Sequence, residues 1–416
     1  MTVSKRSFLK IGGAALAASA APAAFAATRE EGGVLPSVAN AKPIGRDERL
    51  ARIAKAQKLM QEKGVSFLLL EPGAALTYFT GLRWWRSERL VAALIPREGE
   101  VGVVTPYFEE PSVQESLGVP ASVRTWHENE DPFAVVAGYA RDWKLAKGKA
   151  AMEESVRFFV ADGVGRALPD AKVVPGAPIT RPCRMIKSPA ELALMQAAND
   201  VTIAAYAEVY AGLEVGMTSQ DVSALMDAAT RRRGGRPAFS MALFNEASAY
   251  PHGTDAPQVV KESGVVLMDC GCSVHGYRSD ISRTFVYGEA TKRQREVWNT
   301  VKRGQEIAYE TARIGLPAGA VDRAVRSYYE SLGWGPGYQT PGLSHRLGHG
   351  IGMEGHEPIN LVESEETPLA AGMCFSNEPG LYAFGEFGVR LEDCFTMTAD
   401  GPKPFTASAK SLDDPI

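Results

Sequence analysis

The order of the predicted elements after residue 183 places the strongest constraint on the fold. "SPAE" (188–191) is a capping box with proline at the first helical position, and it predicts a long helix ending near Gly212. "TSQD" and "TKRQ" open two further helices, and "GAVDRAVRSYYESLG" has the periodicity of a fourth. Strand-like runs follow the second and the fourth helix. Two helices, strands, two helices and strands predict a duplicated α+β unit over residues 183–410.

A separate α/β domain is predicted to precede this unit. "RDERLARIAKAQKLMQEKG" has helical periodicity ending at Gly64, and "VSFLLL" follows it as a buried strand. Further strand-like and helical runs alternate as far as residue 178, and the Pro-rich "PGAPITRPCR" is expected to connect the domains. A chain of 416 residues is too long for one ordinary domain, so residues 45–178 and 183–410 are assigned to two.

Residues 1–26 have the pattern of an export signal. The basic "SKRSFLK" precedes an Ala/Gly-rich apolar stretch that ends in Ala24-Phe25-Ala26, a small-x-small cleavage site. The basic pair resembles the twin-arginine signal used by proteins exported after folding, with Lys5 in place of the first arginine. We expect a bacterial periplasmic protein with no membrane association after cleavage; a short membrane anchor is the alternative. The net charge of −4 gives no basic field for nucleic acid.

Four carboxylates are predicted to meet at two hairpins. Asp269 ends an apolar strand, and Asp280 stands before the next strand, across a His-Gly turn. Glu378 ends a later apolar strand, and Glu392 lies within another, across a Gly-rich turn. A lone acid at a strand end is more often a turn or cap residue, but acids that face each other are unfavourable unless a cation neutralises them. Oxygen-rich ligation favours two hard divalent ions, with Mn²⁺ ahead of Zn²⁺, Co²⁺ or Fe²⁺.

The residues beside Glu392 divide between two faces of its predicted strand. Arg390 shares the face of Glu392 by the two-residue period, whereas Asp393 points the other way. Asp393 is therefore expected to be solvated or to support the site indirectly, and not to bind metal.

"HRLGHGIGMEGHE" (345–357) holds three of the six histidines of the chain. The i, i+4 spacing of His345 and His349 suggests a metal-binding helix. Four glycines interrupt the stretch, however, and each weakens a helix by about 1 kcal/mol relative to alanine. We therefore expect an extended, glycine-rich segment whose backbone runs close to the metal site.

These segments resemble the pita-bread metallopeptidases, which include Xaa-Pro aminopeptidase, prolidase, methionine aminopeptidase and creatinase. "MDCG", "SDISRTF", "GHGIG", "NEPGLY" and "RLED" carry the resemblance, together with "RMIKSPAELALM". "LTYFTGLRWW" resembles the creatinase-type N-terminal domain more weakly. The resemblance implies an α+β fold with a creatinase-type N-terminal α/β domain before a pita-bread catalytic domain. It also implies five metal ligands: Asp269, Asp280, His349, Glu378 and Glu392, with Asp280 and Glu392 bridging two ions.

The same resemblance implies roles for further residues. His252 in "YPHG", His345 and His356 match the substrate-site histidines of the family. A hydroxide bridging the metals is expected to attack the scissile carbonyl while Glu378 shuttles the proton and His356 stabilises the oxyanion. His252 and His345 would orient the substrate. Arg390 and Tyr382 also match positions near the site of the family, and the alternatives for them are a structural salt bridge and a core aromatic.

The expected activity is hydrolysis of an Xaa-Pro bond, either aminopeptidase P-like or prolidase-like. The absence of a Gly-Asn pair before His252 keeps open a lyase or hydrolase of a small nitrogen- or sulfur-containing compound. Trp84 and Trp85 could cover a cationic substrate, or belong to the core. A catalytically silent binding protein is the third alternative, and unpaired buried acids argue against it.

The five cysteines are expected to be small buried residues. Creatinase-type relatives imply a homodimer.

Overall fold

The computed structural model describes residues 33–416. The predicted export signal at residues 1–26 lies outside the described residues. Within residues 33–416, no helix is both long and apolar enough to cross a membrane.

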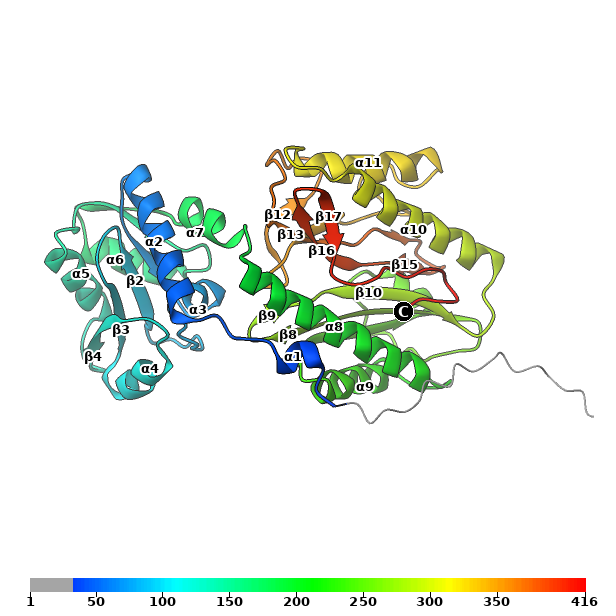
Figure 1. The fold of residues 1–416 in the computed structure, drawn as a ribbon, viewed down its shortest axis with the longest axis horizontal. Helices are drawn as coiled ribbons and strands as arrows, with labels where there is room; N and C mark the ends of the chain where they lie inside the picture. Colours follow the sequence, from blue (N-terminus) through cyan, green and yellow to red (C-terminus); the bar gives the residue numbers. More distant parts are fainter. Residues whose placement is uncertain (1–32) are drawn as a thin grey trace, which may run out of the picture. The chain divides into compact units, whose positions relative to one another are not determined.

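The N-terminal part contains a six-stranded sheet of order β4-β3-β2-β1-β5-β6 (Figure 1). Its strands are β1 (Val65–Leu70), β2 (Ala92–Pro96), β3 (Val101–Pro106), β4 (Ala121–Trp126), β5 (Gly148–Met152) and β6 (Ala171–Pro175). Its helices are α2 (Arg46–Lys63), α3 (Ala74–Thr80), α4 (Glu110–Ser116), α5 (Pro132–Asp142), α6 (Phe158–Ala167) and α7 (Ala177–Arg184). A short α1 (Pro36–Ala39) precedes them.

Helices cover both faces of this sheet, as the alternation along β1 requires. Leu68 packs in a core with side chains of α2, α3, α4 and α7. Leu69, its neighbour, packs in a second core with side chains of α5 and α6. The predicted helix ending at Gly64 and the strand after it are confirmed, and Gly64 has the left-handed φ of 64° expected at a helix end.

The Pro-rich stretch "PGAPITRPCR" does lie between the last strand of the N-terminal sheet and α8, but it is largely helical, because Ala177–Arg184 form α7. Two of its side chains, Ile179 and Cys183, are buried in the core of the N-terminal sheet. This burial stabilises a helix despite the internal Pro182.

The first half of the C-terminal part is a helix pair on an antiparallel sheet of order β10-β8-β7. Its elements are α8 (Pro189–Gly212), α9 (Ser219–Arg232), β7 (Arg236–Phe244), β8 (Gly264–Val274), the short β9 (Tyr277–Arg278) and β10 (Ile281–Tyr287). Both helices begin with the predicted motifs, since the side chains of Ser188 and Thr218 accept backbone hydrogen bonds in capping boxes.

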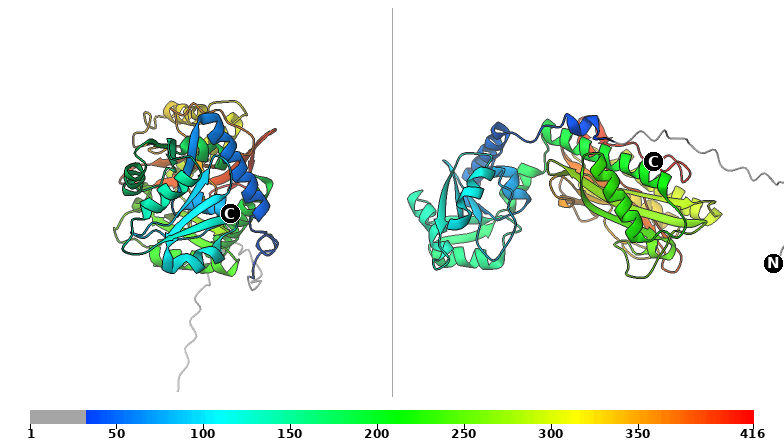
Figure 2. Two further views of the ribbon diagram at one scale, coloured as in Figure 1. Left: turned by 90° about the vertical axis from the view of Figure 1, so that its left-hand side faces the viewer. Right: turned by 90° about the horizontal axis from the view of Figure 1, so that it is seen from below.

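The second half repeats this plan with α10 (Lys292–Thr311) and α11 (Ala318–Ser331) on a sheet of order β12-β11-β13-β16-β17. Its strands are β11 (Gly348–Gly350), β12 (Glu357–Leu361), β13 (Cys374–Asn377), β16 (Asp393–Thr398) and β17 (Gly401–Pro404), and β14 (Gly380–Tyr382) and β15 (Gly388–Arg390) form a separate hairpin. Figures 1 and 2 show α8 and α9 against the first sheet and α10 and α11 against the second. The predicted duplicated order of elements is confirmed.

Candidate metal centre

Asp269 lies on the face of the first sheet that points away from the helices. Its neighbours Met268 and Cys270 pack in the core with α8 and α9, so alternation turns Asp269 to the opposite face. Asp269 was predicted at the strand end, but β8 continues to Val274. The predicted turn is confirmed: His275 and Gly276, with φ of 47° and 90°, form the two-residue loop of a hairpin.

Ser282 explains why three acids converge. In β10 it is the Cα partner of Asp269, and it stands two residues after Asp280. Its carbonyl accepts a hydrogen bond of 3.1 Å from the backbone N–H of Glu392, and its hydroxyl donates one of 2.7 Å to the Glu392 carboxylate. Glu392 lies between β15 and β16, and not within a strand as predicted.

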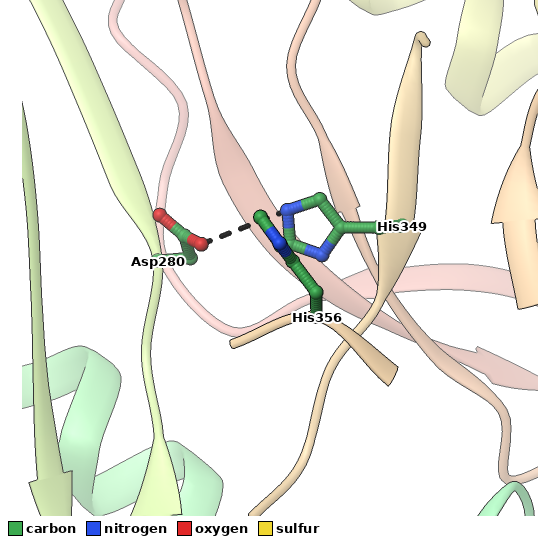
Figure 3. A group of neighbouring side chains, drawn as sticks. All are labelled: Asp280, His349 and His356. Atoms are coloured by element: carbon green, nitrogen blue, oxygen red, sulfur yellow. Dashed lines mark ion pairs between the residues drawn. The ribbon is translucent and has the colours of Figure 1, made fainter. Parts of the chain in front are cut away.

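His349 and Glu378 come from neighbouring strands of the second sheet. His349 is the central residue of β11, and Glu378 directly follows β13. The His349 Nδ1 lies 3.1 Å from the Gly350 carbonyl, so this nitrogen carries the proton. Its Nε2 lies 3.2 Å from Glu378 and 3.7 Å from Asp280 (Figure 3).

Glycine is required at the crossing of these strands. A Cβ at Gly348 would lie 2.1 Å from the Ser376 carbonyl, and one at Gly350 would lie 2.6 Å from the Glu357 carbonyl. The prediction of an extended glycine-rich segment is confirmed, and the i, i+4 spacing does not reflect a helix.

Donor atoms of the two sheets form three overlapping groups, in each of which they lie within 4.8 Å of one another. The groups are Asp269–Asp280–Glu392, His349–Glu378–Glu392 and Asp280–His349–His356. All five predicted ligands are therefore brought together. The third group adds His356, whose exposed ring lies edge-on against His349 at 4.2 Å (Figure 3).

The electrostatics of the cluster fit bound cations. Burial and the charge of Asp269 raise the pKa of Asp280 well above its usual range, and burial raises that of Glu378 to about 7. Burial and the charge of Asp280 likewise raise the pKa of Glu392. Asp269 Oδ1 is buried without a hydrogen-bond partner. Burial lowers the pKa of His349 to about 3, which keeps the imidazole neutral as a metal ligand must be. Four carboxylates and one neutral imidazole suit two hard divalent ions.

Arg390 is the buried cation of the site. Its guanidinium donates to Asp269 Oδ2 at 2.8 Å, to the Tyr382 hydroxyl at 2.9 Å and to the Ser282 hydroxyl at 2.9 Å. The interpretation of Arg390 as a structural salt bridge is confirmed, and this ion pair lies in the wall of the cavity. Tyr382 is fully buried and lies in the same network.

The three predicted substrate histidines line one cavity of about 80 Å³ together with the four acids and the His349 imidazole described above. The residues around it are His252, Asp269, Asp280, His345, Arg346, His349, His356, Glu378, Arg390 and Glu392. Both ring nitrogens of His345 have protein partners: Nδ1 lies 2.7 Å from the Arg346 carbonyl, and Nε2 lies 2.8 Å from the Tyr382 hydroxyl. Because a carbonyl only accepts, Nδ1 donates and Nε2 accepts from Tyr382.

Arg346 is a cavity residue that the sequence reasoning missed. It is partly exposed, and one of its guanidinium nitrogens donates to Asn360 Oδ1 at 2.8 Å. Its charge, after burial, also lowers the pKa of His356. Its position between His345 and His349 in an extended segment was the available signal.

Three other predictions concern residues outside this cavity. Asp393 is fully buried and pairs with Arg283 at 2.7 Å, so the alternative of a solvated side chain is wrong. The alternative of an indirect supporting role fits, because Arg283 also donates to the Glu392 carbonyl at 2.8 Å. Trp84 and Trp85 stack on each other at 4.7 Å in the N-terminal part, and Trp85 is 64% exposed, so it is not a core residue. All five cysteines are buried and unpaired, as expected.

The fold and the carboxylate-rich cavity together are those of a metal-dependent peptidase. Residues 193–399 match the model of metallopeptidase family M24, and residues 52–186 match the creatinase/prolidase N-terminal domain. An uncharacterized peptidase of Schizosaccharomyces pombe is 31% identical over 390 residues, which cover 89% of this chain and 83% of the relative. The chain therefore belongs to metallopeptidase family M24, and the expected pita-bread and creatinase-type fold is confirmed.

Two further relatives are named as dipeptidases. A protein of Lactobacillus delbrueckii named Xaa-Pro dipeptidase is 29% identical, and the match covers 86% of this chain and 97% of the relative. The crystal structure of dipeptidase PepE from Mycobacterium ulcerans is similar with a TM-score of 0.80 and 28% identity, covering 90% of this chain and 97% of that one.

Proposed function

We propose that this protein hydrolyses the bond that precedes proline in short peptides, with two divalent ions held by Asp269, Asp280, His349, Glu378 and Glu392. The convergence of these five donors in one cavity carries the proposal. The Xaa-Pro dipeptidase among the relatives supports the substrate class. Mn²⁺ is the preferred ion because four of the five donors are carboxylates.

The chemistry divides between the ions and the side chains of the chain. When bound, two divalent ions would supply a nucleophile at neutral pH and polarise the scissile carbonyl. The Glu378 carboxylate forms part of the cavity wall and would accept a proton and return it to the leaving amine. His356 and His252 are exposed around the cavity, where they would donate hydrogen bonds to the developing oxyanion and to the substrate.

A substrate panel tests this function. Manganese-loaded protein would be assayed on Xaa-Pro dipeptides, on longer Xaa-Pro peptides and on small betaines, with the Glu378→Gln variant as the blank. Cleavage of an Xaa-Pro peptide above the blank is the predicted result. Turnover of the betaines alone would instead favour the alternative of a small-molecule lyase or hydrolase.

Arg346 is expected to decide between dipeptidase and aminopeptidase specificity. Arg390 already donates to three side chains, whereas Arg346 is partly exposed in the cavity, where it can bind the carboxylate of a C-terminal proline. A hydrogen bond to a charged group contributes about 1.5–3 kcal/mol. Arg346→Gln should therefore raise KM for an Xaa-Pro dipeptide by about 10- to 100-fold.

The matched substrate for this prediction is the same dipeptide with a C-terminal amide. Its KM should be nearly the same in wild type and Arg346→Gln, because the amide has no charge to lose. Arg303→Gln, on the exposed side of α10, is the control variant. If Arg346→Gln raised KM equally for the dipeptide and for its C-terminal amide, Arg346 would have a role other than carboxylate binding.

We also propose that residues 1–26 direct export of the folded chain to the periplasm and that the mature protein is a homodimer. The signal-like pattern of the sequence supports export, and the creatinase-type N-terminal domain supports the dimer.

Two measurements test these proposals. Mass spectrometry of the periplasmic protein should give a chain that begins at Ala27, and light scattering should give twice the mass of that chain. An intact Met1 or a monomeric mass would contradict the respective proposal.

A further inference from the structure

A buried ion pair on α11 has no part in the cavity itself. Asp322 and Arg326 stand one helical turn apart, with Arg326 Nε 2.7 Å from Asp322 Oδ2. Asp322 is fully buried and Arg326 is 4% exposed. Buried ion pairs contribute little net stability compared with apolar side chains of similar size. The role of the two residues therefore depends on their other hydrogen bonds, which both side chains make to the segment before β11.

The guanidinium of Arg326 binds the chain that leads into the active-site segment. Its Nη1 donates to the carbonyls of Leu343 at 2.7 Å and Gly337 at 2.9 Å, and its Nη2 donates to the carbonyl of His345. The guanidinium also lies 3.4 Å from the ring centroid of Tyr338. One side chain thus satisfies three backbone acceptors of this segment.

The Asp322 carboxylate binds the same segment at two further positions. Its Oδ1 accepts the backbone N–H of Leu347 at 3.1 Å, and its Oδ2 accepts the Tyr338 hydroxyl at 2.8 Å. The ion pair therefore holds the His345 carbonyl and the Leu347 N–H, the backbone groups on either side of Arg346.

This segment lacks regular structure of its own. Between Ser331 and Gly348 the structure has no helix and no strand. Backbone polar groups in such a stretch need other partners when they are buried. Asp322 and Arg326 supply them at the end of the stretch where His345 stands.

The ring of His345 is held by this backbone and by the buried cation of the site. Its Nδ1 donates to the Arg346 carbonyl, and its Nε2 accepts from Tyr382, which in turn accepts from Arg390. A displaced His345 backbone would break this chain of hydrogen bonds. We propose that Asp322 and Arg326 are positioning residues that fix His345 for the peptidase reaction, an inference that rests on the proposed function.

Arg326→Lys tests the proposal because lysine keeps the charge but lacks the planar fork that reaches several carbonyls. We expect kcat/KM on an Xaa-Pro dipeptide to fall by about 10-fold, since misplacement by 1 Å can cost about 100-fold. Circular dichroism and bound metal should be unchanged. Arg323→Lys is the matched control, because Arg323 lies on the same helix and donates to the Glu363 carbonyl on the outside.

A double-mutant cycle with His345→Ala separates positioning from a purely structural role. If Arg326 acts through the His345 ring, Arg326→Lys should change the activity of the His345→Ala protein by no more than about 2-fold. The same loss in both backgrounds, or no loss in the wild-type background, would overturn the proposal. Tyr338→Phe removes one hydroxyl from this network and replaces Arg326→Lys in the cycle if that variant does not fold. An inactive wild type would count against the proposed function, whereas additive losses in an active enzyme count only against the positioning role.

Discussion

Glu378→Gln is expected to lower kcat on Xaa-Pro peptides by about 1,000-fold or more, because general acid–base catalysis and a metal-bound carboxylate are lost together. Glu378 lines the cavity, and its carboxylate lies 3.2 Å from His349 Nε2. The side-chain amide of the introduced glutamine cannot accept the proton, and it lacks the anionic oxygen that the Glu378 carboxylate would offer to a metal ion. Burst and steady-state assays on metal-loaded protein would measure the loss.

Glu386→Gln is the matched control for this change. Glu386 lies between β14 and β15, is exposed, and pairs with Arg293 at 3.2 Å. Its replacement should leave kcat within about 2-fold of wild type, as is usual for exposed ion pairs. If Glu378→Gln kept more than a tenth of wild-type turnover, Glu378 would not be the group that moves the proton.

Asp280→Asn is expected to stabilise the metal-free protein while it weakens metal binding and lowers activity. The Asp280 side chain is buried among Asp269, Glu378 and Glu392, and its raised pKa shows that the fold disfavours its charge. A neutral amide relieves this repulsion, which should raise the free energy of unfolding by about 1–3 kcal/mol in chelator. With Mn²⁺ at 100 times its dissociation constant, each bound ion should add about 2.7 kcal/mol to the free energy of unfolding, so the wild type should gain more than the variant, which binds fewer ions.

Asp393→Asn gives the opposite expectation with the same chemical change. Asp393 is also buried, but it pairs with Arg283 and accepts from Gln305 at 2.9 Å. Its loss leaves a buried arginine without its partner and should cost about 3–5 kcal/mol. Denaturant unfolding in chelator would measure the free energy of unfolding of both variants. Destabilisation by Asp280→Asn of the size seen for Asp393→Asn would contradict the view that the four acids repel one another without metal.

The element order was predictable from local signals. Capping sequences at Ser188, Thr218 and Thr291 each fixed a helix start, and the His-Gly turn fixed the hairpin that carries Asp269. These signals act within a few residues, so one sequence contains them in full. The hairpins also predicted a carboxylate-rich site, whereas the assignment of the five ligands came from the family resemblance of the motifs.

Features that depend on distant packing were not predictable. The alternation rule gave the direction of Asp393 correctly but not its burial, because Arg283 of β10 and Gln305 of α10 cover that face. The network of Asp322 and Arg326 joins a helix to a loop about 20 residues away, and no spacing rule connects them. Arg346 was missed although it stands between two predicted site histidines, because its place in the cavity wall depends on the folding of the whole segment.

The most direct measurement of the central claim is the number of Mn²⁺ ions bound by chelator-stripped protein, determined by equilibrium dialysis. The donor groups predict two ions per chain in the wild type and fewer in Asp280→Asn, because that carboxylate belongs to two of the three groups. Wild-type protein that binds no ions, or an Asp280→Asn protein that still binds two with unchanged affinity, would contradict the proposed dinuclear site.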